Sequence, residues 1–379
     1  MAGPSDSLLR ELEAPVALRR FGSGWYAGFF GLVLALSGLG MVLVLRYPDW
    51  LGSPELESLR ESPAFRPVVH AFILGAYALA IVSLLLRRRK ALGFTALAFA
   101  LGAALLGGSN ATAREVESWG IFFGLDFFVL NMVLTGLMFA PLERVAPHRE
   151  EQRLFRVEWR EDLFYFLVSS MLVQAITFLT FAPSTFILDQ TSGFALARAA
   201  VAGQPLALQV IEVMVLSDLA QYWIHRAFHR FPFLWGFHAV HHSAKSMDWL
   251  AGSRMHFIEI GLLRGLTAVP MITLGFSPVA LQIYVGIVYV YSSLLHANVR
   301  GNFDRLGTII ATPRFHHWHH GLEAEAVDKN FAIHFPLLDR LFGTYHLPPG
   351  RWPEAYGVPE AVPSGYLAQF LYPFRRRRA

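Results

Sequence analysis

Long apolar runs are the feature that most constrains how this chain can fold. In the first part of the chain, such runs with few charges cover 24–44, 68–86, 91–107 and 120–140. A helix of roughly twenty apolar residues is long enough to cross the hydrocarbon layer of a bilayer. Only 16% of all residues are charged, whereas about a quarter are charged in soluble domains. The sequence therefore predicts an all-α, polytopic membrane helical bundle.

A charged segment at 143–162 separates these runs from a second set. The second set comprises 163–188, 205–224 and 258–295. The first of these is either one long span or two tilted segments, and the alternation of sides requires that it cross the membrane once. The last of the three is interrupted at Ser277-Pro278, and because proline ends or starts a helix, it predicts a helical hairpin. We expect three regions: an N-terminal transmembrane region of unknown function, a catalytic domain and a basic tail, at 1–150, 151–350 and 351–379.

Arginine and lysine mark one side of the predicted bundle. They concentrate at 87–90, within 143–162 and at 375–378, and positive charge favours the cytoplasmic side of a membrane. The alternation of spans then places the N-terminus, the C-terminus and the histidine-rich stretches in the cytoplasm, as a helical cap on the inner membrane of a bacterium. The excess of basic over acidic residues fits this topology. It does not indicate a nucleic-acid partner, because no basic stripe is interleaved with aromatic residues.

Nine of the fifteen histidines lie in two short stretches, 225–242 and 316–320. Eight of these nine, all except His317, are spaced as HxxxH or HxxHH, which places their rings on one face of a helix. Neutral imidazole binds iron, zinc, copper or nickel, and one tetrahedral zinc needs only four ligands. We therefore expect two metal ions, with His296 at the end of the hairpin as a further ligand. The candidate ligands are His225, His229, His238, His241, His242, His296, His316, His319 and His320.

Several polar residues near these stretches are expected to support the ligands. Asp218 lies seven residues before His225, on the same helical face, and an acid inside a span is costly unless it has a role. A carboxylate that accepts the second N–H of a ligand histidine fixes the orientation of the ring. We expect Asp218 to do so, with Tyr222, Arg254, His256, Glu259 and His317 as further hydrogen-bonding neighbours.

The motifs HRAFH, HAVHH and HHWHH resemble the three histidine boxes of the fatty acid hydroxylase and sterol desaturase superfamily. The resemblance extends over about 160–348 and includes Asp218, Tyr222, the run RMHFIE and the run that begins at Asp328. It implies a di-iron enzyme without haem, with the nine histidines as ligands, that uses O2 to hydroxylate or desaturate a lipid. Since the chain contains no cysteine, the resemblance also implies a separate electron-transfer protein.

Two other functions remain open from the sequence. A zinc-dependent membrane hydrolase would need a general base near the metal, for which Glu259 and Glu323 are the candidates, although no HExxH motif is present. A metal transporter or sensor would need ligands along a path across the bilayer, whereas these histidines are expected on one side. Aromatic residues near the first two boxes would anchor the cap in the headgroups or line a substrate channel: Phe228, Phe231, Phe233, Trp235, Phe237 and Trp249.

Overall fold

The computed structural model describes residues 4–48, 60–113, 125–171, 186, 194–301 and 303–375. The chain divides into two compact units, Met1–Arg156 and Val157–Ala379. The described residues form helices and one isolated bridge between Gly321 and Tyr356, with no strand. The all-α fold class is therefore confirmed.

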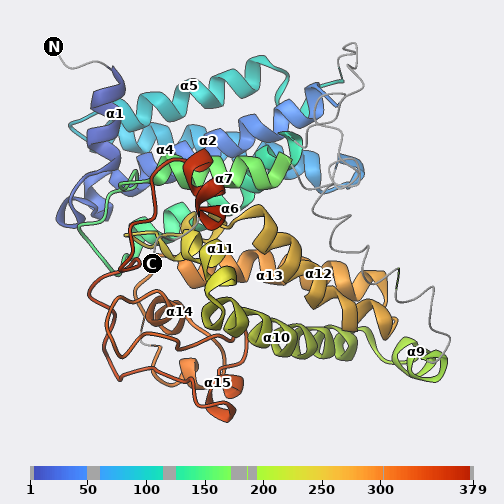
Figure 1. Cartoon of the computed structure of the whole chain (residues 1–379). Coiled ribbons are helices and arrows are strands. Elements are labelled where there is room, and N and C mark those ends of the chain that lie inside the picture. Colours follow the sequence, from blue (N-terminus) through green and yellow to red (C-terminus); the bar gives the residue numbers. More distant parts are fainter. Residues whose placement is uncertain are drawn as a thin grey trace. The chain divides into compact units, whose positions relative to one another are not determined.

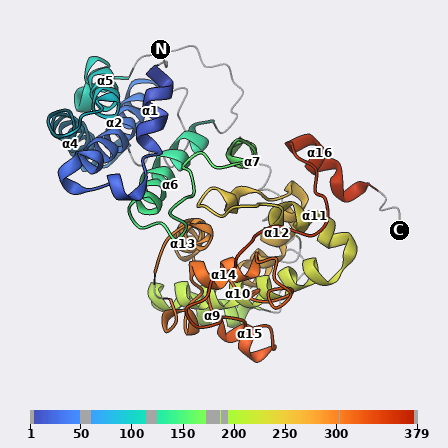
Figure 2. The ribbon, with the colours of Figure 1, turned by 90° about the vertical axis from the view of Figure 1, so that its left-hand side faces the viewer.

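The N-terminal unit is a helical bundle organised around one central helix. This helix, α2 (Trp25–Arg46), packs against α4 (Phe65–Leu86), α5 (Ala91–Leu105) and α6 (Leu125–Val145). Figures 1 and 2 show α2, α4 and α5 side by side, with the short α1 (Pro4–Leu12) beside α5. The predicted spans at 24–44, 68–86 and 91–107 correspond to the first three of these long helices.

Small residues allow the helices of this bundle to approach closely. A Cβ atom on Gly28 of α2 would lie 2.4 Å from Ser83 Oγ, and one on Gly31 would lie 3.2 Å from the backbone nitrogen of Ala80. Glycine at such contacts is typical of membrane helices, which associate by close packing because lipid offers no hydrophobic driving force between them.

Polar contacts gather three segments at one end of this bundle. Glu11 pairs with Arg87 at 2.7 Å and accepts the backbone N–H of Ala91 at 2.8 Å. Arg144 donates to the carbonyl of Leu12 at 2.9 Å, and Arg19 donates to the carbonyl of Arg144 at 3.1 Å. The N-terminal segment, the loop at 87–90 and the start of the charged segment therefore lie at the same end of this bundle.

The C-terminal unit carries the histidine-rich stretches. Its longest helix, α10 (Leu206–Arg230), packs against three others, α11 (Pro232–His242), α12 (Phe257–Thr273) and α13 (Pro278–His296) (Figure 1). The other α-helices among the described residues of this unit are α7 (Trp159–Met171), α9 (Ala195–Ala202), α14 (Pro313–His319), α15 (Leu337–Leu341) and α16 (Tyr366–Leu371).

The predicted break at Ser277-Pro278 is confirmed, since α12 ends at Thr273 and α13 begins at Pro278, and both helices pack against α10. The Ser277 side chain accepts the N–H of Ala280 at 3.2 Å and caps α13, while Pro278 occupies the first turn, where no backbone N–H is needed. Four helical stretches in the described part of the chain are long and apolar enough to cross a membrane: Trp25–Arg46, Phe65–Leu86, Ala91–Asn110 and Pro278–His296. These helices support a multi-pass membrane protein.

The predicted span at 205–224 forms α10 but is not among these four. Its apolar side chains Ile211, Val215 and Leu219 are exposed, whereas Gln209 and Asp218 are buried. A helix in water buries its apolar stripe, so α10 has the opposite polarity, as expected for a helix that faces lipid. Residues 172–185 and 187–188 of the predicted span 163–188, residues 120–124 of the predicted span 120–140, and Arg376–Arg378 of the tail lie outside the described residues.

Candidate metal centre

Four helices deliver the nine predicted ligand histidines to one buried region. His225 and His229 come from the last turns of α10, and His238, His241 and His242 from the end of α11. His296 ends α13, and the last three belong to α14 and its C-cap. The structure divides them into two groups, within each of which the ligand atoms lie within 4.8 Å of one another. The five-histidine group is His225, His229, His238, His242 and His319, and the four-histidine group is His241, His296, His316 and His320.

The Nε2 atoms converge at the centre of each group. In the five-histidine group, His238 Nε2 lies 2.9 Å from His225 Nε2 and 3.0 Å from His242 Nε2. In the four-histidine group, His316 Nε2 lies 3.1 Å from His296 Nε2 and 3.2 Å from His320 Nε2. The groups adjoin, since the rings of His242 and His320 stack at a centroid distance of 4.3 Å.

Each HxxHH box contributes to both groups. His238 and His242, four residues apart, share one group, and the intervening His241 belongs to the other. In α14, His316 and His320 remain together, whereas His319 joins the opposite group. Since neighbouring helical residues point about 100° apart, one turn placed between two centres supplies ligands to both.

The outward nitrogen of most rings hydrogen-bonds to an oxygen acceptor. Nδ1 of His225 lies 3.0 Å from the carbonyl of Phe331, and Nδ1 of His319 lies 2.7 Å from the carbonyl of Lys329. Nδ1 of His238 lies 2.5 Å from Glu259 Oε1. A carbonyl or carboxylate can only accept, so Nδ1 carries the proton and Nε2 presents a lone pair to the centre of its group. This arrangement of donors around metal-binding histidines is common in proteins.

The pKa values of these rings are lowered by their environment. Burial lowers the pKa of His238, His241 and His242 well below the usual value, and neighbouring imidazoles lower it further. The same causes lower the pKa of the three α14 ligands, His316, His319 and His320. Both groups therefore offer neutral imidazoles at neutral pH, the form that binds a metal.

The residues present fit metal ions. Nε2 of His229 and Nε2 of His319 are buried, with no hydrogen-bond partner among the described residues. Lone pairs directed at each other about 3 Å apart repel unless a cation lies between them, and buried polar atoms without a partner are costly. The two groups contain imidazole alone, a donor set suited to iron, zinc, copper or nickel.

A cavity of about 90 Å³ adjoins both groups. Its wall includes His225 and His238 from the five-histidine group and His241, His296 and His316 from the other. Phe228, Leu263, Val288, Leu295 and Ile333 form much of the remaining wall, together with the polar side chains of Gln221 and Ser292. An apolar chain placed here would contact ligands of both groups.

Comparison with known proteins connects this site to one family. Residues 210–344 match the family model "Fatty acid hydroxylase", and this range contains all nine histidines. The matched range is therefore similar to the fatty acid hydroxylase and sterol desaturase superfamily, in agreement with the three histidine boxes. Over 174 residues the chain is 34% identical to the ornithine lipid hydroxylase OlsE of Rhizobium tropici. This match covers 46% of this chain and 52% of that protein.

Alkylglycerol monooxygenases match over shorter stretches. The Caenorhabditis elegans enzyme is 27% identical over 38% of this chain, and the human enzyme is 27% identical over 34%. Each of these two matches covers 28% of the monooxygenase. The chain therefore spans about half the length of the ornithine lipid hydroxylase and about a quarter of each monooxygenase. No solved structure matches the chain significantly.

Asp218 has other partners than the sequence suggested. Its two oxygens accept the backbone N–H groups of Ile333, His334 and Phe335 at 2.7–3.2 Å, so it binds a loop in place of the expected ligand imidazole. Tyr222 shares a 2.8 Å hydrogen bond with Thr344. Asp218 therefore binds the loop beside the histidines directly, whereas Tyr222 contacts it through the ring of Phe331, at a centroid distance of 5.9 Å.

Of the other expected neighbours, Glu259, Arg254 and His317 hydrogen-bond to ligand residues, whereas the hydrogen bonds of His256 go to Ile258 and Phe370. Glu259 accepts from His238, and the carbonyl of Arg254 accepts from His241 Nδ1 at 3.0 Å. The His256 ring accepts the N–H of Ile258 and caps α12. His317 Nε2 lies 3.2 Å from the carbonyl of His296, and it belongs to neither group.

Three further residues are part of the site's support. The histidine spacing gave no sign of them, although they lie in the run beginning at Asp328 that contributes to the family resemblance. Asp328 Oδ1 lies 3.2 Å from His229 Nδ1. The Asn330 side chain binds the carbonyls of Phe315 and His346, and Asp339 accepts the N–H groups of Phe331 and Ala332. A polar residue at a positive φ, such as Asp328 (55°) or Asn330 (59°), has no periodic pattern that could identify it.

The aromatic residues near the boxes have different surroundings. Phe231 and Phe233 are exposed at 57% and 67%, as expected of side chains that lie among headgroups. Phe228 and Phe237 are buried, and Phe228 lines the cavity. The Trp235 indole donates to Glu360, and Trp249 packs edge-on against Phe166.

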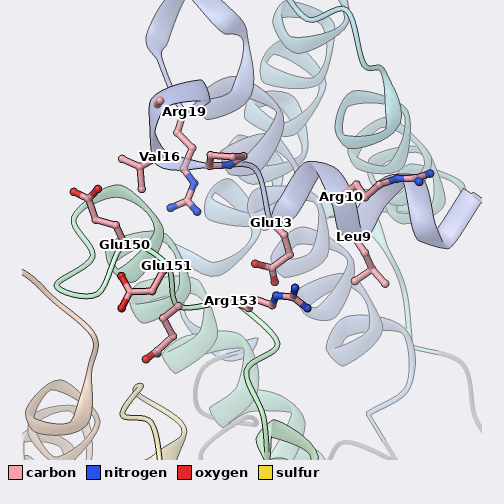
Figure 3. A pocket seen from close by; sticks show the side chains of 11 residues that line it. Leu9, Arg10, Glu13, Val16, Arg19, Glu150, Glu151 and Arg153 are labelled. Carbon is pink, nitrogen blue, oxygen red and sulfur yellow. The ribbon is translucent and has the colours of Figure 1, made fainter. Parts of the chain in front are cut away.

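A larger hollow, of about 680 Å³, lies in the N-terminal unit (Figure 3). Charged side chains of both signs line it, from the segment around α1 and from residues 150–153. Its lining contains no histidine, so the larger hollow is not the candidate metal centre.

Proposed function

We propose that the chain is a membrane-bound di-iron oxygenase that hydroxylates a lipid with O2 and electrons from a separate protein. The observation that carries this proposal is the pair of adjoining groups of five and four buried, neutral imidazoles. Nine nitrogen donors in two groups exceed the four ligands of one tetrahedral zinc, so they favour a pair of metal ions. The family supports iron as that metal.

Hydroxylation is preferred to desaturation because of the relatives. One is named as an ornithine lipid hydroxylase and the others as alkylglycerol monooxygenases. Both names describe insertion of oxygen into a lipid that carries a polar headgroup. We therefore assign this chain a lipid of that general class, with a bacterial membrane as its source.

The protein's own residues would position the reacting carbon and exclude water. The bound metals would supply the activation of O2, and the protein would orient their ligands through Nδ1. The apolar wall formed by Phe228, Leu263 and Val288 would hold an acyl or alkyl chain against ligands of both groups. Because α10 exposes an apolar face, the tail of the substrate could remain in the bilayer.

The histidine groups are proposed to lie on the cytoplasmic side, near the inner surface of the membrane. The polybasic loop at 87–90 lies at the same end of the N-terminal bundle as the N-terminal segment, and positive charge favours the cytoplasmic side. An electron donor in the cytoplasm would then have direct access to the cap.

Metal content and product analysis test the proposal together. The detergent-purified full-length chain is expected to bind about two irons and to form a hydroxylated lipid only with O2 and a reductant. His319→Ala should lose metal and product, whereas His70→Ala in the N-terminal unit should keep both. Stoichiometric zinc with lipid hydrolysis, or metal flux into vesicles without oxidation, would overturn the proposal in favour of a hydrolase or a transporter.

A further inference from the structure

One short loop orients three of the five histidines in the five-histidine group. Asp328 Oδ1 lies 3.2 Å from Nδ1 of His229, and the carbonyl of Lys329 lies 2.7 Å from Nδ1 of His319. The carbonyl of Phe331 lies 3.0 Å from Nδ1 of His225. Four consecutive residues, 328–331, therefore set the ring orientation of ligands from two different helices, α10 and α14.

The backbone of this loop is held in an unfavourable conformation. Asp328 and Asn330 have φ values of 55° and 59°, in the left-handed region that residues other than glycine rarely adopt. Such a conformation persists only when the surroundings fix it. The Asn330 side chain contributes by donating to the carbonyls of Phe315 and His346 and by accepting the N–H of His346 at 2.8 Å.

Two fully buried carboxylates bind the next five backbone N–H groups. Asp339 accepts from Phe331 at 2.8 Å and from Ala332 at 2.9 Å. Asp218 accepts the N–H groups of the following three residues, Ile333, His334 and Phe335. Asp339 thus fixes the loop to α15. Asp218 fixes the loop to α10, the helix that also carries His225 and His229, two of the ligands that the loop orients.

The four-histidine group obtains its acceptors elsewhere. Nδ1 of His241 lies 3.0 Å from the carbonyl of Arg254, and Nδ1 of His296 lies 2.8 Å from the carbonyl of Ser292 in its own helix. Nδ1 of His316 and Nδ1 of His320 have no hydrogen-bond partner among the described residues. The loop at 328–335 therefore orients none of these four rings.

We propose that Asp218 and Asp339 are positioning residues for one of the two metals only. By fixing the loop at 328–335 they hold three ligands of the five-histidine group in place, whereas none of the four rings of the other group has its Nδ1 bonded to this loop. This inference rests on the proposed function, in which each group binds one metal.

Asparagine variants test the inference at constant side-chain size. Both oxygens of each aspartate accept N–H donors, so the NH2 group of Asp218→Asn or Asp339→Asn must face a donor in either orientation. We expect each variant to hold one of its two irons about ten- to a hundredfold more weakly, the effect typical of lost support around metal ligands, and the other iron unchanged. Titration with a chelator followed by metal analysis measures the affinity of each group for its iron. Electron paramagnetic resonance then detects the single iron that stays bound after the other has been removed.

Glu161→Gln is the matched control, because Glu161 also accepts a backbone N–H, that of Gly365 at 2.9 Å, and the side-chain amide of Gln369 at 3.0 Å. These contacts fix the C-terminal segment and not the loop, so this variant should keep both irons even where its melting temperature falls. Asparagine variants that keep both irons, or lose both equally, would overturn the inference. A wild-type chain that binds fewer than two metals would instead overturn the proposed function.

Discussion

Replacing Glu259 by glutamine is the sharpest single test of how the site works. The carboxylate lies 2.5 Å from Nδ1 of His238, and the Glu259 side chain is 1% exposed. Glutamine keeps the size of the side chain but replaces the acid group that orients the His238 ring through Nδ1 by an amide. We expect metal affinity to fall about ten- to a hundredfold, which corresponds to roughly 1.4–2.7 kcal/mol at 1.36 kcal/mol per tenfold change.

The assay separates metal binding from turnover. Iron(II) bound per chain is measured against a competing chelator, and product formed is then expressed per bound iron. At saturating iron, Glu259→Gln should recover most of the wild-type turnover. Glu212→Gln is the control, because Glu212 accepts from Gln204 at 3.0 Å, roughly three and a half turns of α10 before His225.

Two results would refute this reasoning. If Glu259→Gln binds metal normally but loses turnover per bound metal, the carboxylate acts as a base on the substrate or a water, as the hydrolase alternative requires. If both quantities are unchanged, the hydrogen bond to His238 does not support the site.

Three further outcomes are expected. His241→Ala and His319→Ala should each remove oxidation but leave a folded N-terminal unit, which limited proteolysis would detect. Gly28→Val should destabilise the N-terminal bundle by about 1–3 kcal/mol through overpacking against Ser83, measured as a lower melting temperature in detergent. Burial lowers the pKa of His334 from 6.5 to about 4, so the fold loses stability as pH falls between these values. His334→Leu should remove up to roughly 3 kcal/mol of that acid-dependent loss, seen as a flatter profile of melting temperature against pH.

Much of the fold follows from local patterns. Apolar runs located α2, α4 and α5, and the pair Ser277-Pro278 located the turn between α12 and α13, because length, capping and proline chemistry act within a few residues. The α10 helix was also located, although Gln209 and Asp218 make it less apolar than the other spans. Its buried polar face became evident only from the packing of α11, α12 and α13 around it.

The sequence by itself determined which side chains can bind metal, since HxxxH and HxxHH on a helix bring imidazoles together at fixed spacing. Tertiary structure decided how they divide: His241 and His242 are adjacent in the chain but belong to different groups, because the crossing of four helices places two centres on either side of one turn. It also decided the partners of Asp218 and Asp339. The carboxylate oxygens of both residues accept backbone N–H groups of an irregular loop, which lies far from Asp218 in the sequence. Contacts with an irregular loop produce no periodic pattern of residues, so the sequence alone does not indicate them.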